Sequence, residues 1–332
     1  MTTAAELPST DSSPASDLAV RTRDYSVFGG VLRSDIEFPE LTTSNEGALP
    51  TWTMVVRNGA PPNDELATLG ARQIGEERYQ LVRTTSGLRL VYSHAGTFDI
   101  AADGSRIVWY YRPDALPELL RSIVIGPAIS LALELAGFLC LHGSAVAIDD
   151  AAVAFVGPKY HGKSTLATAL TAAGGRLIGD DLLVVRAGNP ATVRPGVASV
   201  RLWADMAAAL PLGSICDTLI PGVKTTAIGF AGEALARGST TLRAIYVLCP
   251  TSRDAAAAPA MRQLLSPSEA TIALAHQTKL PASLVGLRAA GSQLTAAAAV
   301  AATVPVWTLR AVRDVAKLDE VVRQIMEWSR AK

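Results

Sequence analysis

Residues 151–181 read AAVAFVGPKYHGKSTLATALTAAGGRLIGDD, and they carry the clearest indication of the fold. The apolar run 151–156 is typical of a buried strand, and residues 164–173 have a helical composition that ends at Gly174-Gly175. Between them, residues 157–164 fit the pattern G-x-x-x-x-G-K-S/T. A strand, a glycine-rich loop and a helix in this order predict a phosphate-binding loop in an α/β fold.

Each fixed position of this loop has a physical reason. Gly157 ends the strand and Gly162 lets backbone N–H groups approach a polyphosphate closely. Lys163 reaches the β- and γ-phosphates, and the hydroxyl of Ser164 can bind Mg²⁺. His161 is not required by the pattern, so it either donates to a phosphate or points to solvent. The predicted nucleotide contacts are Gly157, Pro158, Lys159, Tyr160, His161, Gly162, Lys163, Ser164 and Thr165.

Two neighbouring carboxyl groups, Asp180 and Asp181, follow the next predicted strand, 176–178. The intervening helix and strand return the chain to the end of the sheet that carries the loop. One carboxylate can hold Mg²⁺, and the other can accept the proton of an attacking hydroxyl, a role that contributes about 10²–10⁴-fold. A pair of turn aspartates explains the same residues equally well. Asp149-Asp150, before the loop strand, is predicted to be such a turn.

The remaining sequence narrows the class of protein. The 332 residues carry 30 basic and 30 acidic side chains, so no overall charge attracts nucleic acid or a membrane surface. Three sparse cysteines favour a reducing, cytoplasmic setting over a disulfide framework. Residues 123–141 are almost entirely apolar, but Pro127 and Glu134 favour a buried helix over a membrane span.

The pattern divides the chain into three regions. Residues 1–22 are rich in Ser, Thr, Pro and Ala and are predicted to be a disordered tail. Residues 23–113 contain short β-like runs separated by turns, which predict a smaller, antiparallel, β-rich N-terminal domain. In residues 114–332 strands and helices alternate, and this region carries the loop and a last helix at 318–330.

His142 lies at the start of the strand before the loop strand, in Leu-His-Gly-Ser-Ala-Val. A single histidine on an apolar strand is either a core residue or a catalytic one, and its position does not decide between them.

The ordered set of these motifs resembles the kinase domain of HPr kinase/phosphorylase, which is itself similar to the nucleotide site of phosphoenolpyruvate carboxykinase. The set consists of His142-Gly143, a strand, the loop, a short helix ending in glycine, and Asp180-Asp181. The sequence is most similar to the HPr-kinase-like proteins of peptide natural-product clusters, including those of lasso peptides. That similarity extends to three further segments: Arg201-Leu202-Trp203, Ile-Tyr-Val-Leu at 245–248, and Val304-Pro305-Val306.

The resemblance implies roles for individual residues. Lys163 would contact the γ-phosphate, Asp180 would be the base, and Asp181 would bind metal together with Ser164. The opposite assignment of the two aspartates is also consistent with the resemblance. His142 would contact phosphate or the base. Lys224 would stabilise charge on the transferring phosphoryl group, or be a solvated surface lysine. The same two alternatives apply to Arg201. The loop departs from the small and acidic residues that HPr kinases prefer, which leaves the choice between ATP and GTP open.

These features together predict an ATP- and Mg²⁺-dependent kinase with a P-loop domain of the HPr kinase/phosphoenolpyruvate carboxykinase type. The expected acceptor is a hydroxyl, first a serine of a precursor peptide or small protein, and second a small-molecule hydroxyl. A non-catalytic protein that uses ATP as a conformational switch is the third alternative. The N-terminal domain would either present the acceptor or mediate self-association into a homo-oligomer. No nucleic-acid or membrane partner is expected.

Overall fold

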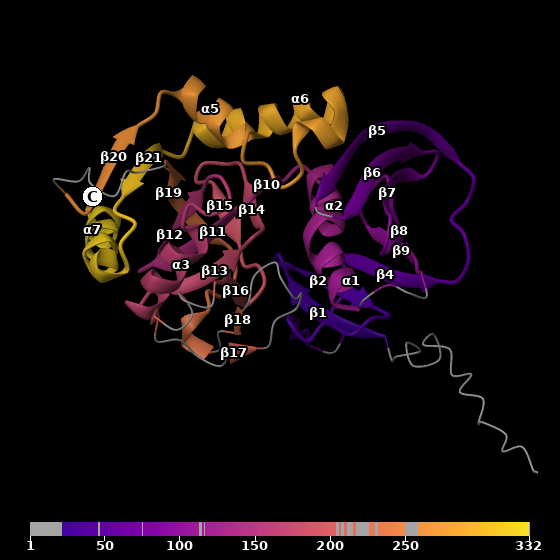
Figure 1. Ribbon diagram of the computed structural model, residues 1–332, viewed down its shortest axis with the longest axis horizontal. Helices are drawn as coiled ribbons and strands as arrows, with labels where there is room; N and C mark the ends of the chain where they lie inside the picture. Colours follow the sequence, from indigo (N-terminus) through magenta and orange to yellow (C-terminus); the bar gives the residue numbers. More distant parts are fainter. Residues whose placement is uncertain are drawn as a thin grey trace, which may run out of the picture.

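The computed structural model describes residues 22–45, 47–74, 76–112, 115, 117–203, 206, 209–210, 215–216, 226–229, 232–249 and 258–331 (Figure 1). The predicted tail 1–22, except its last residue, and Lys224 lie outside these residues. The described chain is a mixed α/β structure with two nine-stranded sheets and one three-stranded sheet. Both large sheets contain parallel and antiparallel pairs.

The first sheet has the strand order β3-β1-β2-β4-β9-β8-β7-β6-β5. Most neighbours are antiparallel, as expected from the turn signals, but β4 pairs in parallel with both β2 and β9. The prediction of an antiparallel domain is therefore wrong at β4, because long connections rather than hairpins join it to both neighbours. The strands are β1 Arg23–Val27, β2 Gly30–Ser34, β3 Thr42–Thr43, β4 Trp52–Arg57, β5 Glu65–Ile74, β6 Glu77–Thr84, β7 Gly87–Tyr92, β8 Gly96–Ala101 and β9 Arg106–Tyr110.

The apolar segment after this sheet is buried and mostly helical, as predicted, but its last residues, 139–141, form a strand instead. It consists of α1 Pro117–Ile123, a π-helical turn η1 Val124–Ala128 that contains Pro127, and α2 Ile129–Leu135. Its apolar side chains share one hydrophobic core with the first sheet, with Cys140 and Val184 of the second sheet, and with Leu182, which lies between two strands of the second sheet. The helix therefore lies between the two sheets (Figure 1). No helix in the described parts of the chain is long and apolar enough to cross a membrane.

The second sheet carries the sequence motifs. Its order is β10-β14-β15-β19-β12-β11-β13, with β21 paired to β19 and β20 to β21. The strand before the loop, β12, is parallel to β19, and β19 is parallel to β21. The strands are β10 Leu139–Leu141, β11 Gly143–Ile148, β12 Ala151–Val156, β13 Arg176–Asp180, β14 Leu183–Arg186, β15 Thr192–Arg194, β19 Thr240–Leu248, β20 Ala260–Leu264 and β21 Val306–Ala311. The three-stranded sheet is β16 Ser199–Leu202, β17 Ile215–Cys216 and β18 Thr226–Gly229.

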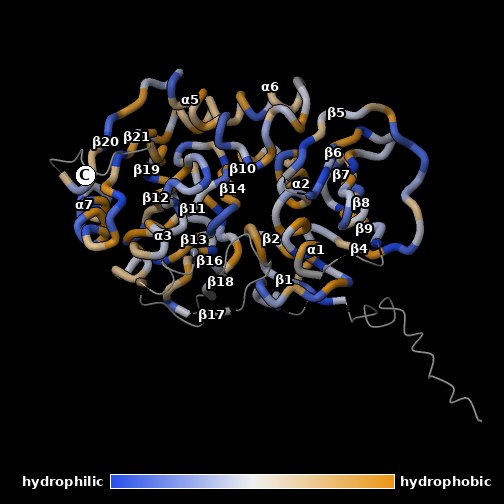
Figure 2. The backbone as a smooth tube through the Cα atoms, viewed as in Figure 1, coloured by the Kyte–Doolittle hydropathy of each residue, from blue (hydrophilic) through white to orange (hydrophobic). Residues whose placement is uncertain are grey.

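Helices cover both faces of the second sheet. Val153 and Phe155 of β12 share a core with α3 Lys163–Ala172 and α7 Leu318–Arg330. Ala152 and Ala154, which point to the opposite face, share a core with α5 Pro267–Ala275 and α6 Ala282–Ala301. A strand buried on both faces is apolar throughout, which explains the uniform run 151–156. Figure 2 shows such apolar stretches in the interior of the sheets and hydrophilic residues on the outer turns.

The two sheets meet close to β13, the strand that ends at Asp180. The β1–β2 turn, with positive φ at Phe28 and Gly29, inserts the fully buried Phe28 toward Gly196. Arg194 Nη1 donates to the Phe28 carbonyl at 3.1 Å, and Gly196 N donates to the carbonyl of Ile178 at 2.7 Å. The first sheet thus supports the end of β13, where Asp180 lies.

Replacing Phe28 with alanine is expected to lower the free energy of unfolding by about 3–5 kcal/mol, because the ring leaves a cavity between the two sheets. Urea titration followed by circular dichroism measures the loss. Ser26→Ala, at an exposed position of the preceding strand β1, is the control and should change stability by less than about 0.5 kcal/mol. A Phe28→Ala loss as small as the control's would show that this contact does not join the sheets.

Candidate active site

Backbone geometry forms the loop between β12 and α3. Gly157 has a φ of +143°, and a Cβ there would lie 3.1 Å from the carbonyl oxygen of Leu248. Gly162 is the N-cap of α3 with a φ of +87°, and nothing lies within 4 Å of its ideal Cβ. Gly157 is therefore required by both space and conformation, and Gly162 by conformation alone. Beyond Gly162 the first N–H groups of α3 have no carbonyl partners within the helix, which is the arrangement that binds anions.

Lys163, the first residue of α3, turns back over the loop. Its side chain is buried, and Nζ donates to the carbonyls of Gly157 at 2.8 Å and Pro158 at 2.9 Å. The ammonium group is therefore held inside the curve of the loop, where a bound phosphate would lie.

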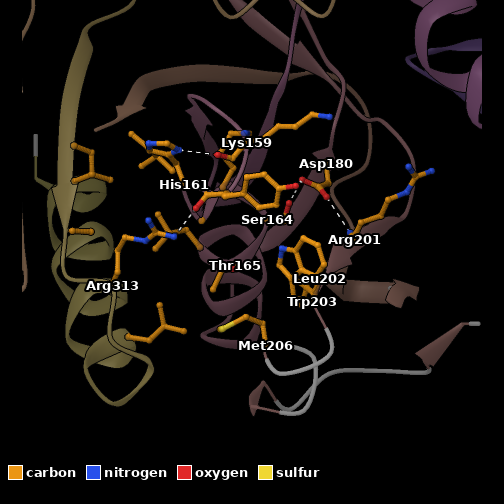
Figure 3. Close-up of a pocket in the computed structure, with 18 of the residues that line it drawn as sticks. Lys159, His161, Ser164, Thr165, Asp180, Arg201, Leu202, Trp203, Met206 and Arg313 are labelled. Carbon is orange, nitrogen blue, oxygen red and sulfur yellow. Dashed lines mark hydrogen bonds between the residues drawn. The ribbon is translucent and has the colours of Figure 1, made fainter. Parts of the chain in front are cut away.

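The variable loop residues contact both walls of a cavity. His161 Nδ1 lies 2.9 Å from the carbonyl oxygen of Lys159, within the loop itself. The Tyr160 ring stacks on Trp203 with centroids 5.8 Å apart, and Arg313 Nη2 donates to the Tyr160 carbonyl at 2.6 Å (Figure 3). Trp203 follows β16 and Arg313 follows β21, so the loop joins these two segments.

Asp180 is the last residue of β13 and is buried. Its Oδ1 accepts hydrogen bonds from the hydroxyls of Ser144 at 2.5 Å and Ser164 at 2.9 Å. Its Oδ2 accepts one from the backbone N–H of Arg201 at 3.1 Å (Figure 3). The structure thus brings one carboxylate of the pair directly onto the hydroxyl that ends the loop motif.

Asp181 has different partners. Its Oδ2 lies 2.7 Å from Lys279 Nζ, and its Oδ1 lies 3.1 Å from His142 Nδ1. Burial opposes ionisation of this carboxyl group, but the ammonium of Lys279 and the imidazole of His142 outweigh it and hold the pKa of Asp181 well below its usual range. The side chain is nevertheless 43% exposed, so solvent weakens these interactions. Asp181 is therefore an ionised carboxylate that remains accessible from the cavity.

These groups line one cavity of about 430 Å³. The loop, both aspartates, His142 and Arg201 form its polar part, while apolar residues of β16, β21 and the start of α7 complete the wall. Of the predicted nucleotide contacts, the cavity lining includes Lys159, Tyr160, His161, Gly162, Lys163, Ser164 and Thr165. Gly157 and Pro158 lie behind them, at the Lys163 ammonium.

Three residues of this site were not predicted from the sequence. Ser144 lies two positions after His142 in the quoted Leu-His-Gly-Ser-Ala-Val segment, and that spacing could have identified it. Lys279 and Arg313 have no local signal, because each comes from a distant connection whose path depends on the whole fold. Lys224, which the resemblance placed at the site, lies outside the described residues.

The residues present fit a magnesium ion bound together with a nucleotide. The hydroxyl of Ser164 and the carboxylate of Asp180 lie 2.9 Å apart and offer oxygen atoms, the ligand type that Mg²⁺ prefers. Within the described ranges, no group of three or more His, Cys, Asp or Glu side chains could hold a metal ion. Mg²⁺ is commonly held by one or two carboxylates, waters and the phosphates of the substrate, and this pair can supply the protein's share.

No model of a known protein family matches the sequence, and no curated protein matches it. Among solved structures, the Hpr(Ser) kinase/phosphatase from Coxiella burnetii is similar with 14% identity. That match covers 57% of this chain and 91% of the other chain, with a TM-score of 0.30. A similarity of this size does not place the chain in a family.

Proposed function

We propose that this protein is an ATP- and Mg²⁺-dependent kinase that transfers the terminal phosphoryl group of ATP to a hydroxyl. The observation that carries the proposal is the hydrogen bond between Ser164, at the end of the glycine-rich loop, and Asp180. A loop serine and a carboxylate at the end of a neighbouring strand are the pair that holds Mg²⁺ in nucleotide-hydrolysing P-loop proteins.

The contacts support an exchange of the roles expected for the two aspartates. Asp180 lies on Ser164, so we assign Asp180 rather than Asp181 to the magnesium ion. Asp181 is more exposed and is held by His142 and Lys279, so we assign it to the acceptor hydroxyl. Its low pKa makes it a weak base in the ground state, and its main contribution is to orient the hydroxyl.

In the proposed reaction, the acceptor oxygen forms a bond to the γ-phosphorus while the bond to the bridging oxygen of ADP breaks. The hydroxyl proton passes to Asp181. Ser164 and Asp180 would hold Mg²⁺, which would supply positive charge against the phosphates. Lys163 compensates the charge that develops on the β- and γ-phosphate oxygens. Because the protein forms no covalent intermediate, its contribution is positioning and charge stabilisation.

The acceptor is proposed from the resemblance of the motifs alone: a serine of a ribosomal precursor peptide or of a small protein. A small-molecule hydroxyl is compatible with the same site. The role of Lys224 remains a prediction. The domain boundary between residues 113 and 114 is also still a prediction: α1 and α2 follow that boundary in the sequence but pack on the first sheet.

Incubation with Mg²⁺ and γ-¹⁸O-labelled ATP tests the function. Candidate peptides, small proteins and alcohols are added, and mass spectrometry should find one product that gains the labelled phosphoryl group, about 80 daltons before the isotope increment. EDTA is the control and should abolish the gain. Tight ATP binding without ADP formation or a labelled product would favour the switch protein instead.

A further inference from the structure

We propose that Lys279 is a positioning residue of this site: it holds the Asp181 carboxylate in the orientation that receives the acceptor hydroxyl. The inference rests on the proposed function, since it concerns the acceptor side of the same reaction. Lys279 lies in the connection between α5 and α6, distant in sequence from every motif of the site.

Lys279 makes two contacts with the same residue. Its Nζ donates to Asp181 Oδ2 at 2.7 Å and to the Asp181 carbonyl at 3.2 Å. Asp181 has a φ of +69°, a conformation that costs free energy for a side chain larger than glycine and persists only where its surroundings hold it. The lysine thus restrains both the carboxylate and the strained backbone that carries it.

The burial of the two side chains shows how Lys279 acts. The Lys279 side chain is 12% exposed and the Asp181 side chain 43%. Asp181 and His142 line the cavity, whereas Lys279 is not among the described residues that do so. The ammonium group therefore lies behind the carboxylate and acts on the reaction through Asp181 rather than by touching the substrate.

The backbone fixes Lys279 relative to His142. Lys279 N donates to the Cys140 carbonyl at 2.8 Å, and His142 N donates to the Gln277 carbonyl at 2.7 Å. Leu141 and Thr278 form an isolated β-bridge between these two hydrogen bonds. Residues 277–279 thus extend the edge of the second sheet beside β10, and His142 and Lys279 reach Asp181 from two segments that one ladder holds together.

A neighbouring contact ties this ladder to the helical layers. Gln293 of α6 donates through Nε2 to the Leu280 carbonyl at 2.8 Å and to Glu134 of α2 at 3.1 Å. Leu280 directly follows Lys279, so the lysine backbone has little freedom to shift. A flexible surface lysine would lack these restraints and would lose side-chain entropy on pairing.

The charge distribution of the aspartate pair gives Lys279 a second effect. Asp180 is satisfied by two hydroxyls and one backbone N–H, while Asp181 is paired with Lys279 and His142. The carboxylates of Asp180 and Asp181 repel each other, and the Asp181 side chain, which is partly exposed, can rotate into solvent. Lys279 opposes that rotation, so its removal should misplace Asp181 even where the rest of the fold is intact.

The test is a double-mutant cycle with Lys279→Met and Asp181→Asn, and Lys279→Arg as the conservative variant. Lys279→Met should lower kcat about 10–100-fold with an unchanged KM for ATP, the size expected when a reacting group is misplaced by about 1 Å. Because Lys279 acts through Asp181, the double variant should be no slower than Asp181→Asn alone. Lys279→Arg should recover part of the lost kcat.

Arg330→Met is the matched control, since Arg330 forms a 3.4 Å ion pair with Asp149 in which both side chains are more than half exposed. Its kcat should equal that of the unaltered protein, and thermal melting should show that all variants fold. If the fold-losses in kcat of the two single variants multiplied in the double variant, the proposal would be overturned, and Lys279 would instead act by contacting the substrate. An unchanged kcat in Lys279→Met would also overturn it.

A crystal structure of Lys279→Met separates this inference from the proposed function. We expect the Asp181 carboxylate to leave His142 in that variant, and retention of the 3.1 Å contact would overturn the positioning role. An unaltered protein that transfers no phosphoryl group would overturn the proposed function, and the crystal structure would then decide on Lys279 independently.

Discussion

Replacing Asp180 by asparagine is expected to reduce phosphoryl transfer by about 10²–10³-fold, the usual effect of removing one group that stabilises transition-state charge. The amide has the shape of the carboxylate but lacks the negative charge that pairs with Mg²⁺. ATP should still bind, because the loop backbone and Lys163 remain. Initial rates with labelled ATP and binding by calorimetry measure the two effects separately.

The hydrogen bonds of Asp180 predict the accompanying change in stability. Both carboxylate oxygens accept hydrogen bonds, from Ser144, Ser164 and the N–H of Arg201. An amide presents one oxygen and one NH₂ group, so in either orientation at least one of these donors loses its acceptor. A buried donor without a partner costs about 1–3 kcal/mol, which the fold should survive.

Asp149→Asn is the matched control for this variant. Asp149 is an exposed aspartate with a φ of +53° in the β11–β12 turn, a conformation that asparagine tolerates well. It should keep full transfer activity. If Asp180→Asn kept activity within threefold of this control, Asp180 would not belong to the site. If the unaltered protein formed no product and Asp180→Asn changed only ATP affinity, the switch alternative would be favoured.

The second large effect is expected for Lys163→Met, which should lower transfer by about 10²–10³-fold and weaken ATP binding. The ammonium group already lies 2.8 Å from the Gly157 carbonyl and 2.9 Å from the Pro158 carbonyl, inside the loop that would surround the phosphates. Methionine keeps the apolar stem and the helix start, so circular dichroism and the melting temperature should show an intact fold.

Lys317→Met is the control for Lys163→Met, because Lys317 is exposed in the short helix η3 Val315–Lys317 and does not belong to the cavity lining. Its transfer rate and ATP affinity should match those of the unaltered protein. Full activity of Lys163→Met would contradict the assignment of the glycine-rich loop as the nucleotide site.

Local patterns predicted several elements well. The strand 151–156 and the helix 318–330 have the predicted bounds, and the loop helix begins one residue earlier than expected, at Lys163. Asp149-Asp150 forms the predicted turn. These features depend on residues close together in sequence: an apolar run, a periodic helix face, and glycines or aspartates that permit positive φ.

Pairing between distant segments was harder to predict. The parallel pairing of β4 depends on the path of its long connections, which alternating apolar residues do not specify. The packing of α1 and α2 between the sheets depends on which apolar surfaces are left to cover. Both features depend on which apolar surfaces, formed by residues distant in sequence, become buried against each other.

The sequence alone predicted an α/β fold, a glycine-rich loop with the pattern of phosphate-binding loops, and an aspartate pair at the end of the next strand. The sequence did not predict that Asp180 contacts Ser164, that Asp181 contacts His142 and Lys279, or that Tyr160 contacts both walls of the cavity. Each of these contacts joins segments that are separated along the chain. A loop motif acts through neighbouring residues, whereas the partners of each carboxylate come from segments that only the complete packing of sheets and helices brings together.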